Sequence, residues 1–516
     1  MKLKKSFGLV LLSTAAIVAS GCGKKGGDAG TIQLWSSFGA TYTDALQTIV
    51  DKVAASTGVS IQHESKGGYP EIRREMISAV AAGDYPNLAT GYPDHFISYL
   101  GSEVLTPLDD MFTQEEINDY YEEYLTENRF YDNGGNNAKL RLYGVPFNKS
   151  TELLGYNGVF VDYCASLEAD LGVLPATWQD WAVKGPRYRQ IFNDIIGSKI
   201  YGIQDVDGTA HSFATAPFDG GKLLLDLSQV DKDKTLLMAW DSPENALITL
   251  IRQWGARYTE LPEDQATKTV KRRKGSVWFT SDEDSAKVVK CLRFFSELYH
   301  DEKGKIFGLP GHLGSSYASS AFENCKVMFM ICSSGGLSYN TAKWNHRFRV
   351  APIPYYAGEY GTNKYVISQG ANICLTNKEG SEDAFKVLKA LTSSEFQTEW
   401  CLKTGYFPAS KTAANSQAYT DFINSTDYSA GGTAVAFREG AAVNKNIYTK
   451  ESEGWHKFVD PAFEGSAILR ESLSGVLKTA CEKETTASDA DFRSILNAIK
   501  AVPDLVSLTG KTIEFK

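Results

Sequence analysis

Strand-like and helix-like patterns of apolar residues alternate from residue 31 onward. Residues 31–35 predict a short strand, and residues 43–55 carry apolar side chains at the three- and four-residue spacing of an amphipathic helix. Residues 59–62 predict the next strand and residues 69–82 the next helix. A strand, a helix and a strand in this order are typical of a parallel sheet. The pattern therefore predicts an α/β fold.

The alternation continues with an extended segment at residues 87–91 and a helix at residues 93–101. Further along, residues 286–300 and residues 382–392 each place their apolar side chains on one side of a helix. No repeat with the period of a solenoid or a propeller is present in the sequence. The chain is therefore expected to build globular lobes.

Length and charge limit the classes of protein to which the chain can belong. It has 516 residues with 43% hydrophobic side chains, so it is not largely disordered, and it is too long for one hydrophobic core. The 53 basic and 62 acidic residues give a net charge of -9, which argues against a nucleic-acid binder. A basic run at residues 271–274 lies in an acidic stretch without aromatic neighbours, and we interpret it as a solvated loop.

The N-terminus has the features of an export signal. Lys2, Lys4 and Lys5 precede an uncharged apolar stretch at residues 7–19, which is shorter than a membrane span. No comparable apolar stretch follows it, so the rest of the chain is expected to lie outside the membrane.

A cysteine closes this signal. Residues 19–22 read Ala-Ser-Gly-Cys and resemble a bacterial lipobox, in which the cysteine, here Cys22, is acylated. We therefore expect residues 1–21 to be a lipoprotein signal peptide and residues 22–30 to be a flexible, Gly-rich tether. Plain secretory cleavage is the alternative interpretation.

The remaining cysteines are expected to be free. Seven of them follow Cys22, and an odd number cannot pair completely. Most lie in apolar segments, which favours buried thiols over a disulfide framework. They are Cys164, Cys291, Cys325, Cys332, Cys374, Cys401 and Cys481.

Motifs for metal, phosphate and nucleophilic chemistry are missing. The sequence has no His-Glu-x-x-His, no Cys-x-x-Cys and no Gly-x-Ser-x-Gly. Residues 205–208 begin like a calcium loop, but the later ligands do not follow at the required spacing. We expect no metal, no cofactor and no catalytic residue. Glycoside hydrolysis stays open, because its two carboxylates need no local motif.

Aromatic residues beside glycines and hydroxyl groups provide the positive signal. The chain has 26 Tyr, 26 Phe and 9 Trp; Trp35 precedes two serines, Tyr69 follows two glycines, and Tyr406 follows a Thr-Gly pair. An aromatic ring in such a place can stack on a sugar while backbone amides reach the sugar hydroxyls. Core packing is the competing interpretation for any single aromatic residue.

Several segments between residues 31 and 438, taken in order, resemble the family 1 extracellular solute-binding proteins of ABC importers. They include AAGDYPN at 81–87, YGVPFNKST at 143–151, LPATWQD at 174–180, VAPIP at 350–354 and TGYFP at 404–408. The resemblance implies a two-lobed periplasmic-binding-protein-like fold of type II, with the ligand cleft between lobes joined by a hinge of several chain crossings. Independently of the family, α/β sheets bind ligands at the carboxyl ends of their strands.

Within the family, the chain resembles most the glycerol-3-phosphate-binding branch, and this likeness implies a set of ligand-binding residues. The branch uses an arginine to grip the phosphate, matched by Arg438, and a glutamate to bind the glycerol hydroxyls, for which Asp94 is the nearest acid. The ligand-binding residues expected, with Trp35 added for its aromatic context, are Trp35, Tyr69, Asp94, Ser150, Ser333, Ser334, Gly370, Tyr406 and Arg438.

The family fold also implies how the chain divides. Residues 31–147 and 333–372 are expected in lobe one, and residues 153–330 and 377–516 in lobe two. The chain would then cross between lobes at residues 148–156, near Cys332, and at residues 373–376.

The function implied is that of a tethered receptor, which closes around a small polyol phosphate or sugar and passes it to the transmembrane subunits of an ABC permease. We expect a monomer on the extracytoplasmic side, anchored to the bacterial membrane only through its lipid. Two other classes stay open. An exported carbohydrate-active enzyme would show turnover of a glycoside, and a surface interaction lipoprotein would show no thermal shift with sugars or phosphates.

Overall fold

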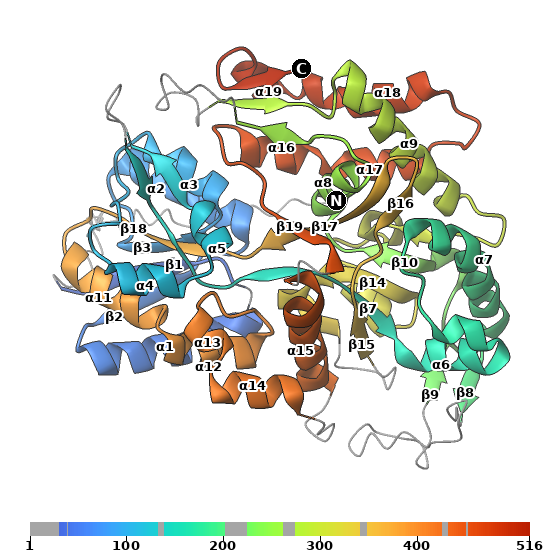
Figure 1. The fold of residues 1–516 in the computed structure, drawn as a ribbon, viewed down its shortest axis with the longest axis horizontal. Coiled ribbons are helices and arrows are strands. Elements are labelled where there is room, and N and C mark those ends of the chain that lie inside the picture. The colour runs from blue at the N-terminus through green and yellow to red at the C-terminus, as the bar shows by residue number, and fades with distance from the viewer. Residues whose placement is uncertain are drawn as a thin grey trace, which may run out of the picture.

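The computed structural model describes residues 30–38, 40–132, 139–201, 224–261, 274–340, 348–425, 432–449 and 453–516. Two β-sheets lie side by side, each with helices packed around it (Figure 1). The signal peptide, Cys22, nearly all of the tether, residues 205–208 and nearly all of the basic run lie outside the described residues.

The first sheet contains the strands predicted at the start of the chain. Its order is β2, β1, β3, β18, β6, with β1 parallel to both β2 and β3 and with β18 antiparallel to β3 and β6. The strands are β1 (Ile32–Ser36), β2 (Ile61–Ser65), β3 (Leu88–Gly91), β6 (Val145–Pro146) and β18 (Asn372–Leu375). The parallel β1–α1–β2 unit is thereby confirmed, with each strand beginning one or two residues later than the pattern predicts.

Helices cover this first sheet. Leu46, Ile49 and Val53 of α1 are buried, as the three- and four-residue spacing predicts. The helices are α1 (Ala40–Thr57), α2 (Tyr69–Ala82), α3 (Pro93–Leu100), α11 (Ser381–Leu391) and α12 (Ser394–Thr404), and both α11 and α12 pack against α1. No helix in the described part of the chain is long and apolar enough to span a membrane.

The second sheet is larger and mixed. Its order is β13, β10, β14, β7, β17, β16, with β15 also paired to β7 and β19 also paired to β17. The strands are β7 (Ser150–Asn157), β10 (Leu236–Trp240), β13 (Phe307–Gly308), β14 (Val327–Ser333), β15 (Phe348–Ala351), β16 (Tyr356–Gly358), β17 (Gly361–Gln369) and β19 (Trp455–Phe458). Strand β14 is buried along almost its whole length, so it forms the centre of this lobe.

The strand pairings revise the expected lobe boundaries. Residues 333–372 were assigned to lobe one, but β15, β16 and β17 belong to the second sheet, and only β18 returns to the first. Residues 377–516 were assigned to lobe two, but α11 and α12 pack on α1. The chain crosses at residues 147–149 and again beside Gly370, because β17 pairs with β7 through Ser368 and Thr151 immediately before that point.

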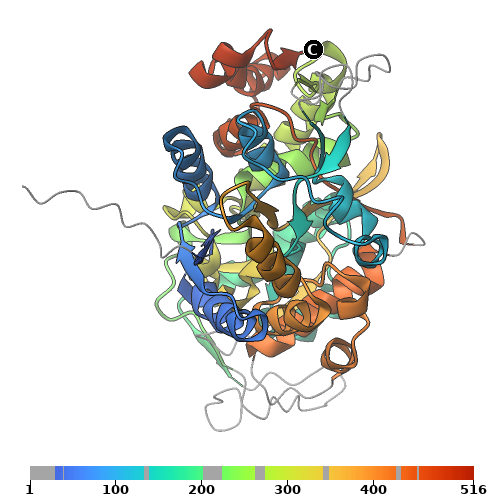
Figure 2. The same cartoon turned by 90° about the vertical axis from the view of Figure 1, so that its left-hand side faces the viewer.

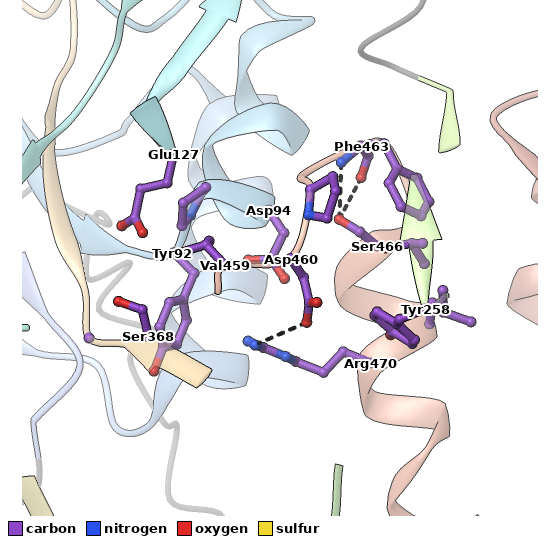
Figure 3. A pocket seen from close by; sticks show the side chains of 15 residues that line it. Tyr92, Asp94, Glu127, Tyr258, Ser368, Val459, Asp460, Phe463, Ser466 and Arg470 are labelled. Carbon is purple, nitrogen blue, oxygen red and sulfur yellow. Dashed lines mark hydrogen bonds and ion pairs between the residues drawn. The ribbon is translucent and has the colours of Figure 1, made fainter. Parts of the chain in front are cut away.

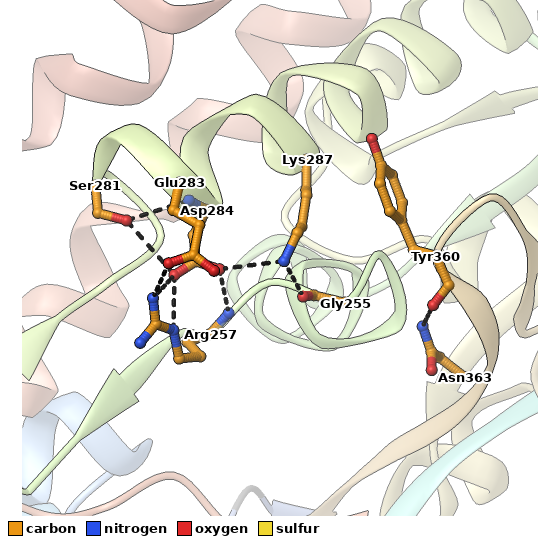
Figure 4. Close-up of polar contacts among 8 residues, drawn as sticks. All are labelled: Gly255, Arg257, Ser281, Glu283, Asp284, Lys287, Tyr360 and Asn363. Atoms are coloured by element: carbon orange, nitrogen blue, oxygen red, sulfur yellow. Dashed lines mark hydrogen bonds and ion pairs between the residues drawn. The ribbon is translucent and has the colours of Figure 1, made fainter.

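Polar contacts fix the start of a long helix in the second lobe, α9 (Asp282–Tyr299) (Figure 4). The side chain of Ser281 accepts a hydrogen bond from the backbone N–H of Asp284, which is the preferred arrangement at a helix N-terminus. The buried Asp284 carboxylate also accepts a hydrogen bond of 2.8 Å from Nε of Arg257. The helix therefore starts four residues before the predicted residue 286, because the cap at Ser281 rather than the apolar pattern determines where it begins.

The C-terminal segment contacts both lobes. It contains α16 (Ser466–Ser472), α17 (Ser474–Glu482), α18 (Asp489–Asn497) and β20 (Ile513–Phe515), and β20 pairs with β12 (Gly275–Val277) of the second lobe. Helix α16 contacts both α8 (Pro243–Gln253) and α3, and the ion pair between Arg73 of α2 and Glu471 measures 3.0 Å. Figures 1 and 2 show this segment in red along one end of the molecule. It bridges the two lobes.

The predicted state of the cysteines is confirmed. All seven that follow Cys22 are free and buried, in both lobes. They act as small apolar side chains of the core.

Candidate functional site

A pocket of about 500 Å³, its open mouth included, lies between the two lobes (Figure 3). Side chains from the start of α3, from the chain crossing and from the C-terminal segment line it together. The lining residues are Tyr92, Pro93, Asp94, Glu127, Tyr258, Thr259, Ser368, Gly370, Val459, Asp460, Pro461, Phe463, Ser466, Leu469 and Arg470. The pocket therefore changes shape whenever the lobes move relative to one another.

The start of α3 positions Tyr92 and Asp94. Strand β3 ends at Gly91, Tyr92 is still extended, and Pro93 occupies the first turn of the helix, where its missing N–H does no harm. Both side chains thus stand at the carboxyl end of a strand, the usual ligand edge of an α/β sheet. Asp94 Oδ1 is buried and has no hydrogen-bond partner in the described part of the chain. Nε2 of the neighbouring His95 lies 3.8 Å from this oxygen. Burial lowers the pKa of His95 to about 4, so its imidazole is neutral at neutral pH.

Arg470 approaches the pocket from the opposite lobe. Its Nη2 lies 3.9 Å from Oδ2 of Asp460, whose other oxygen accepts a hydrogen bond of 3.1 Å from Arg252. The guanidinium carbon also lies 5.5 Å from the centre of the Tyr92 ring. Burial lowers the pKa of Arg470, but Asp94 and Asp460 outweigh this effect and hold the pKa above its usual value. The side chain is a cation poised between two carboxylates.

The predicted tyrosines meet beside this pocket. The rings of Tyr69 and Tyr92 are 4.4 Å apart, and the Asn148 side chain donates a hydrogen bond of 3.3 Å to the Tyr69 hydroxyl. Burial raises the pKa of Tyr69, and hydrogen bonds to Asn148 and Tyr406 offset part of that rise. Burial also raises the pKa of Tyr406, so both Tyr69 and Tyr406 keep their phenolic protons.

Tyr406 is also close to the predicted serines. A Cβ atom at Gly335 would lie 2.7 Å from the Tyr406 ring, so only glycine fits there without a shift. The Ser333 hydroxyl accepts a hydrogen bond of 3.2 Å from the backbone of Gly335, and the buried Ser334 hydroxyl has no partner among the described residues. On its other side Tyr406 stacks on Trp400, with ring centres 5.9 Å apart. The residue thus belongs both to the cleft and to an aromatic cluster of the first lobe.

The chain crossing holds Gly370 and Ser150. Gly370 has φ of +103°, and a Cβ atom there would lie 1.7 Å from the carbonyl oxygen of Asn148, so the position requires glycine. Lys149 donates a hydrogen bond of 3.1 Å to the Gly370 carbonyl and forms a buried ion pair of 2.6 Å with Glu127. Ser150 is buried and pairs with the last residue of β17. These polar contacts hold the chain crossing together beside the pocket.

Two of the expected ligand-binding residues lie elsewhere. Trp35 is partly buried against the α2–α3 side of the first lobe, and Nζ of Lys66 lies 3.9 Å from its ring centre. Arg438 is buried in α15 (Gly432–Val443), and the adjacent Glu439 pairs with Arg349 at 2.6 Å. Neither Trp35 nor Arg438 lines the pocket. Of the expected set, only Asp94 and Gly370 line it directly.

A buried carboxyl group lies beside Ser333 in the second sheet. Glu152 pairs across the strands with Ser333, and its Oε1 accepts a hydrogen bond of 2.8 Å from Nε1 of Trp240. Burial raises the pKa of Glu152 to about 8, so the group is protonated at neutral pH. Glu152 therefore adds no negative charge beside Ser333 at neutral pH.

The family model described as "Bacterial extracellular solute-binding protein" matches residues 48–426. The chain belongs to this family. Membership confirms the predicted role in solute binding and the extracytoplasmic location. Comparison with the curated proteins finds none that is significantly similar.

Solved structures share the fold of this solute-binding protein at low sequence identity. UgpB from Mycobacterium tuberculosis, in complex with glycerophosphocholine, is 17% identical with a TM-score of 0.61 and covers 92% of this chain and 98% of its own. The GacH receptor of Streptomyces glaucescens, described with acarbose, is 13% identical with a TM-score of 0.59 and covers 92% and 99%. Maltose-bound MalE3 of T. maritima is 14% identical with a TM-score of 0.61 and covers 92% and 99%. The predicted two-lobed fold is confirmed.

One wall of the pocket in this solute-binding protein comes from beyond the matched region. The match ends at residue 426, whereas Asp460 and Arg470 follow it. Sequence reasoning missed both residues because neither belongs to a motif. It also missed Tyr92, although Tyr92 stands two residues before the expected Asp94 and follows the glycine that ends β3.

Proposed function

We propose that this solute-binding protein captures a small sugar or polyol phosphate between its lobes and delivers it to the permease subunits of an ABC importer. The observation that carries the proposal is the pocket itself, to which both lobes contribute aromatic and charged side chains. Lipid attached to Cys22 would keep the receptor close to the permease, which fits the lipobox in the sequence.

The lining supports a ligand rich in hydroxyl groups. Tyr92 and Tyr258 offer aromatic surface, and Asp94, Asp460 and Arg470 offer charged hydrogen-bonding groups within the same small volume. Carbohydrate sites combine apolar ring faces with a few fixed polar groups in this way. The solved structures in complex with maltose, maltotriose and acarbose support this class of ligand.

A polyol phosphate is the second candidate, and two observations favour it. UgpB, the structure in complex with glycerophosphocholine, shares the fold, and Tyr69 and Tyr406, two of the residues that the resemblance to the glycerol-3-phosphate branch implies, are neighbours. The branch implies that Arg438 grips the phosphate, but Arg438 does not line this pocket, so Arg470 is the cation among the lining residues that a phosphate could reach.

Native mass spectrometry of the purified receptor, followed by calorimetry, tests the proposal. We expect a bound mass in the range of a mono- to trisaccharide or a glycerol phosphate, and a binding isotherm with the matching compound. The proposed function is refuted if calorimetry detects no binding of neutral mono- to trisaccharides, of glycerol 3-phosphate or of glycerophosphocholine. Turnover of a chromogenic glycoside, lost in a carboxylate variant, would instead identify a carbohydrate-active enzyme.

A further inference from the structure

Three buried oxygen atoms in the pocket lack hydrogen bonds to the described residues. They are Oδ1 of Asp94, Oδ2 of Asp460 and the hydroxyl of Ser368, whose side chains are 13%, 14% and about 7% exposed. Buried polar atoms are usually hydrogen-bonded in folded proteins, so these three atoms are available to bond a ligand that enters the pocket. Arg470 faces the same space, and its Nη2 lies 3.9 Å from Oδ2 of Asp460, which is beyond hydrogen-bond distance. The pocket therefore holds acceptors and donors that the fold leaves unused.

The charges around these atoms nearly balance. Asp460 is engaged by Arg252 at 3.1 Å, and Glu127 by Lys149 at 2.6 Å. This leaves the Arg470 cation facing the Asp94 carboxylate. A phosphate group, with a charge of about -1.5 to -2 near pH 7, would have to lie against Asp94 and Asp460. Like charges in a partly buried site repel strongly, so the balance disfavours an anion.

An uncharged diol satisfies the same groups without this repulsion. Each hydroxyl can donate to a carboxylate oxygen and accept from the guanidinium, and hydrogen bonds to charged partners are the stronger kind. The Tyr92 ring, close to Arg470, offers a flat apolar face beside them. We infer that Arg470, Asp460, Asp94 and Ser368 form the recognition end of the ligand site and bind adjacent hydroxyl groups of a neutral saccharide. This inference rests on the proposed function and selects one of its two ligand classes.

The variants Arg470→Gln and Ser368→Ala test the inference by calorimetry. Titration with maltose, maltotriose and tagatose as neutral probes, and with glycerol 3-phosphate and glycerophosphocholine as charged probes, first ranks the ligands of the unmodified protein. We expect the best ligand to be neutral and its affinity to fall at least tenfold in Arg470→Gln and three- to tenfold in Ser368→Ala. Ser368→Ala removes only a hydroxyl group without a partner, so its melting temperature should not fall.

Thr249→Val is the matched control for the serine variant. Thr249 in α8 also has a buried hydroxyl without a partner among the described residues, but it does not line the pocket, so its removal should leave affinity unchanged. If none of the five compounds binds the unmodified protein, the proposed function is wrong, and this inference with it. If a charged probe binds best, or if both pocket variants fold and keep full affinity, the inference alone is wrong.

Discussion

Replacing Lys149 by methionine should destabilise the protein far more than the loss of an ordinary surface charge. Lys149 and Glu127 are 1% and 3% exposed, and their charged atoms are 2.6 Å apart. Removing one partner of a buried pair leaves the other charge uncompensated, at a cost of about 3–5 kcal/mol. Asn372 still donates a hydrogen bond of 2.8 Å to Glu127 in the variant, so we expect the lower end of that range, about 3 kcal/mol.

Urea unfolding followed by tryptophan fluorescence measures this loss. The surface pair of Lys52 and Glu399 provides the control, since its distance is 2.7 Å but its side chains are 51% and 23% exposed. Lys52→Met should cost less than about 1 kcal/mol, because water screens exposed pairs. The double variant Glu127→Leu with Lys149→Met removes both buried charges, and it should be more stable than Lys149→Met alone.

Two results would refute this reasoning. The first is a stability of Lys149→Met equal to that of Lys52→Met, which would mean that water reaches the crossing and screens the pair. The second is a loss of stability in the double variant equal to the sum of the two single losses, which would mean that each side chain acts through its packing rather than its charge.

Three further predictions concern the lipid anchor, the tyrosines and a buried acid. Cys22→Ala should block acylation and release the protein in soluble form, and labelling with a fatty-acid probe checks this; equal labelling of the variant would contradict it. Tyr69→Phe and Tyr406→Phe should each weaken ligand binding by about 1 kcal/mol in calorimetry with little change in melting temperature, because each loses only a hydroxyl group. Glu152, whose pKa burial raises to about 8, is stabilising in its protonated form, and that contribution is lost as the pH rises from about 4.5 through 8. The melting temperature of Glu152→Gln minus that of the unmodified protein should therefore increase between pH 5 and 8 and stay constant above pH 8. A difference that is constant over the whole range would show that the carboxyl group does not titrate there.

Local elements were predictable because their signals are local. Helix α2 spans Tyr69–Ala82 as predicted, since Pro70 marks its first turn and Gly83, with φ of +72°, ends it. The start of α9 was predicted four residues late, because the apolar pattern begins after its cap at Ser281. The hydrophobic pattern thus predicts where a helix lies more accurately than the residue at which its capped end falls.

The distribution of segments between lobes was not predictable in the same way. Strand β17 joins the second sheet by pairing with β7, more than 200 residues earlier in the chain, through Ser368 with Thr151 and Gln369 with Ser150. Nothing in either segment specifies the other, since both are short strands of mixed polar and apolar residues. The crossing beside Gly370 follows from this pairing and from the close backbone approach that only glycine allows.

The candidate site was predicted in part for a similar reason. Tyr69, Gly370 and Tyr406 stand in short Gly-containing motifs that resemble a known family, and the fold places Tyr69 beside Tyr406 and Asn148, with Gly370 against the Asn148 backbone. Asp460 and Arg470 belong to a segment beyond the family match, and their role depends on where α16 docks. A charged residue on an amphipathic helix has the same sequence signature whether it faces solvent or a pocket.

The arrangement of the pocket explains how a ligand can drive closure of the lobes. A ligand that touches Asp94 on one side and Arg470 on the other gains contacts only when the lobes are close, so it favours the closed state. Moving a two-state balance from 1:99 to 99:1 requires about 5.5 kcal/mol, and two or three hydrogen bonds to charged groups, at about 1.5–3 kcal/mol each, supply that amount. The ion pair between Arg73 and Glu471 also bridges the lobes, but Glu471 is 44% exposed, and exposed pairs contribute less than about 1 kcal/mol. If the protein works as proposed, the ligand rather than the Arg73–Glu471 pair would therefore supply most of the free energy that favours the closed state.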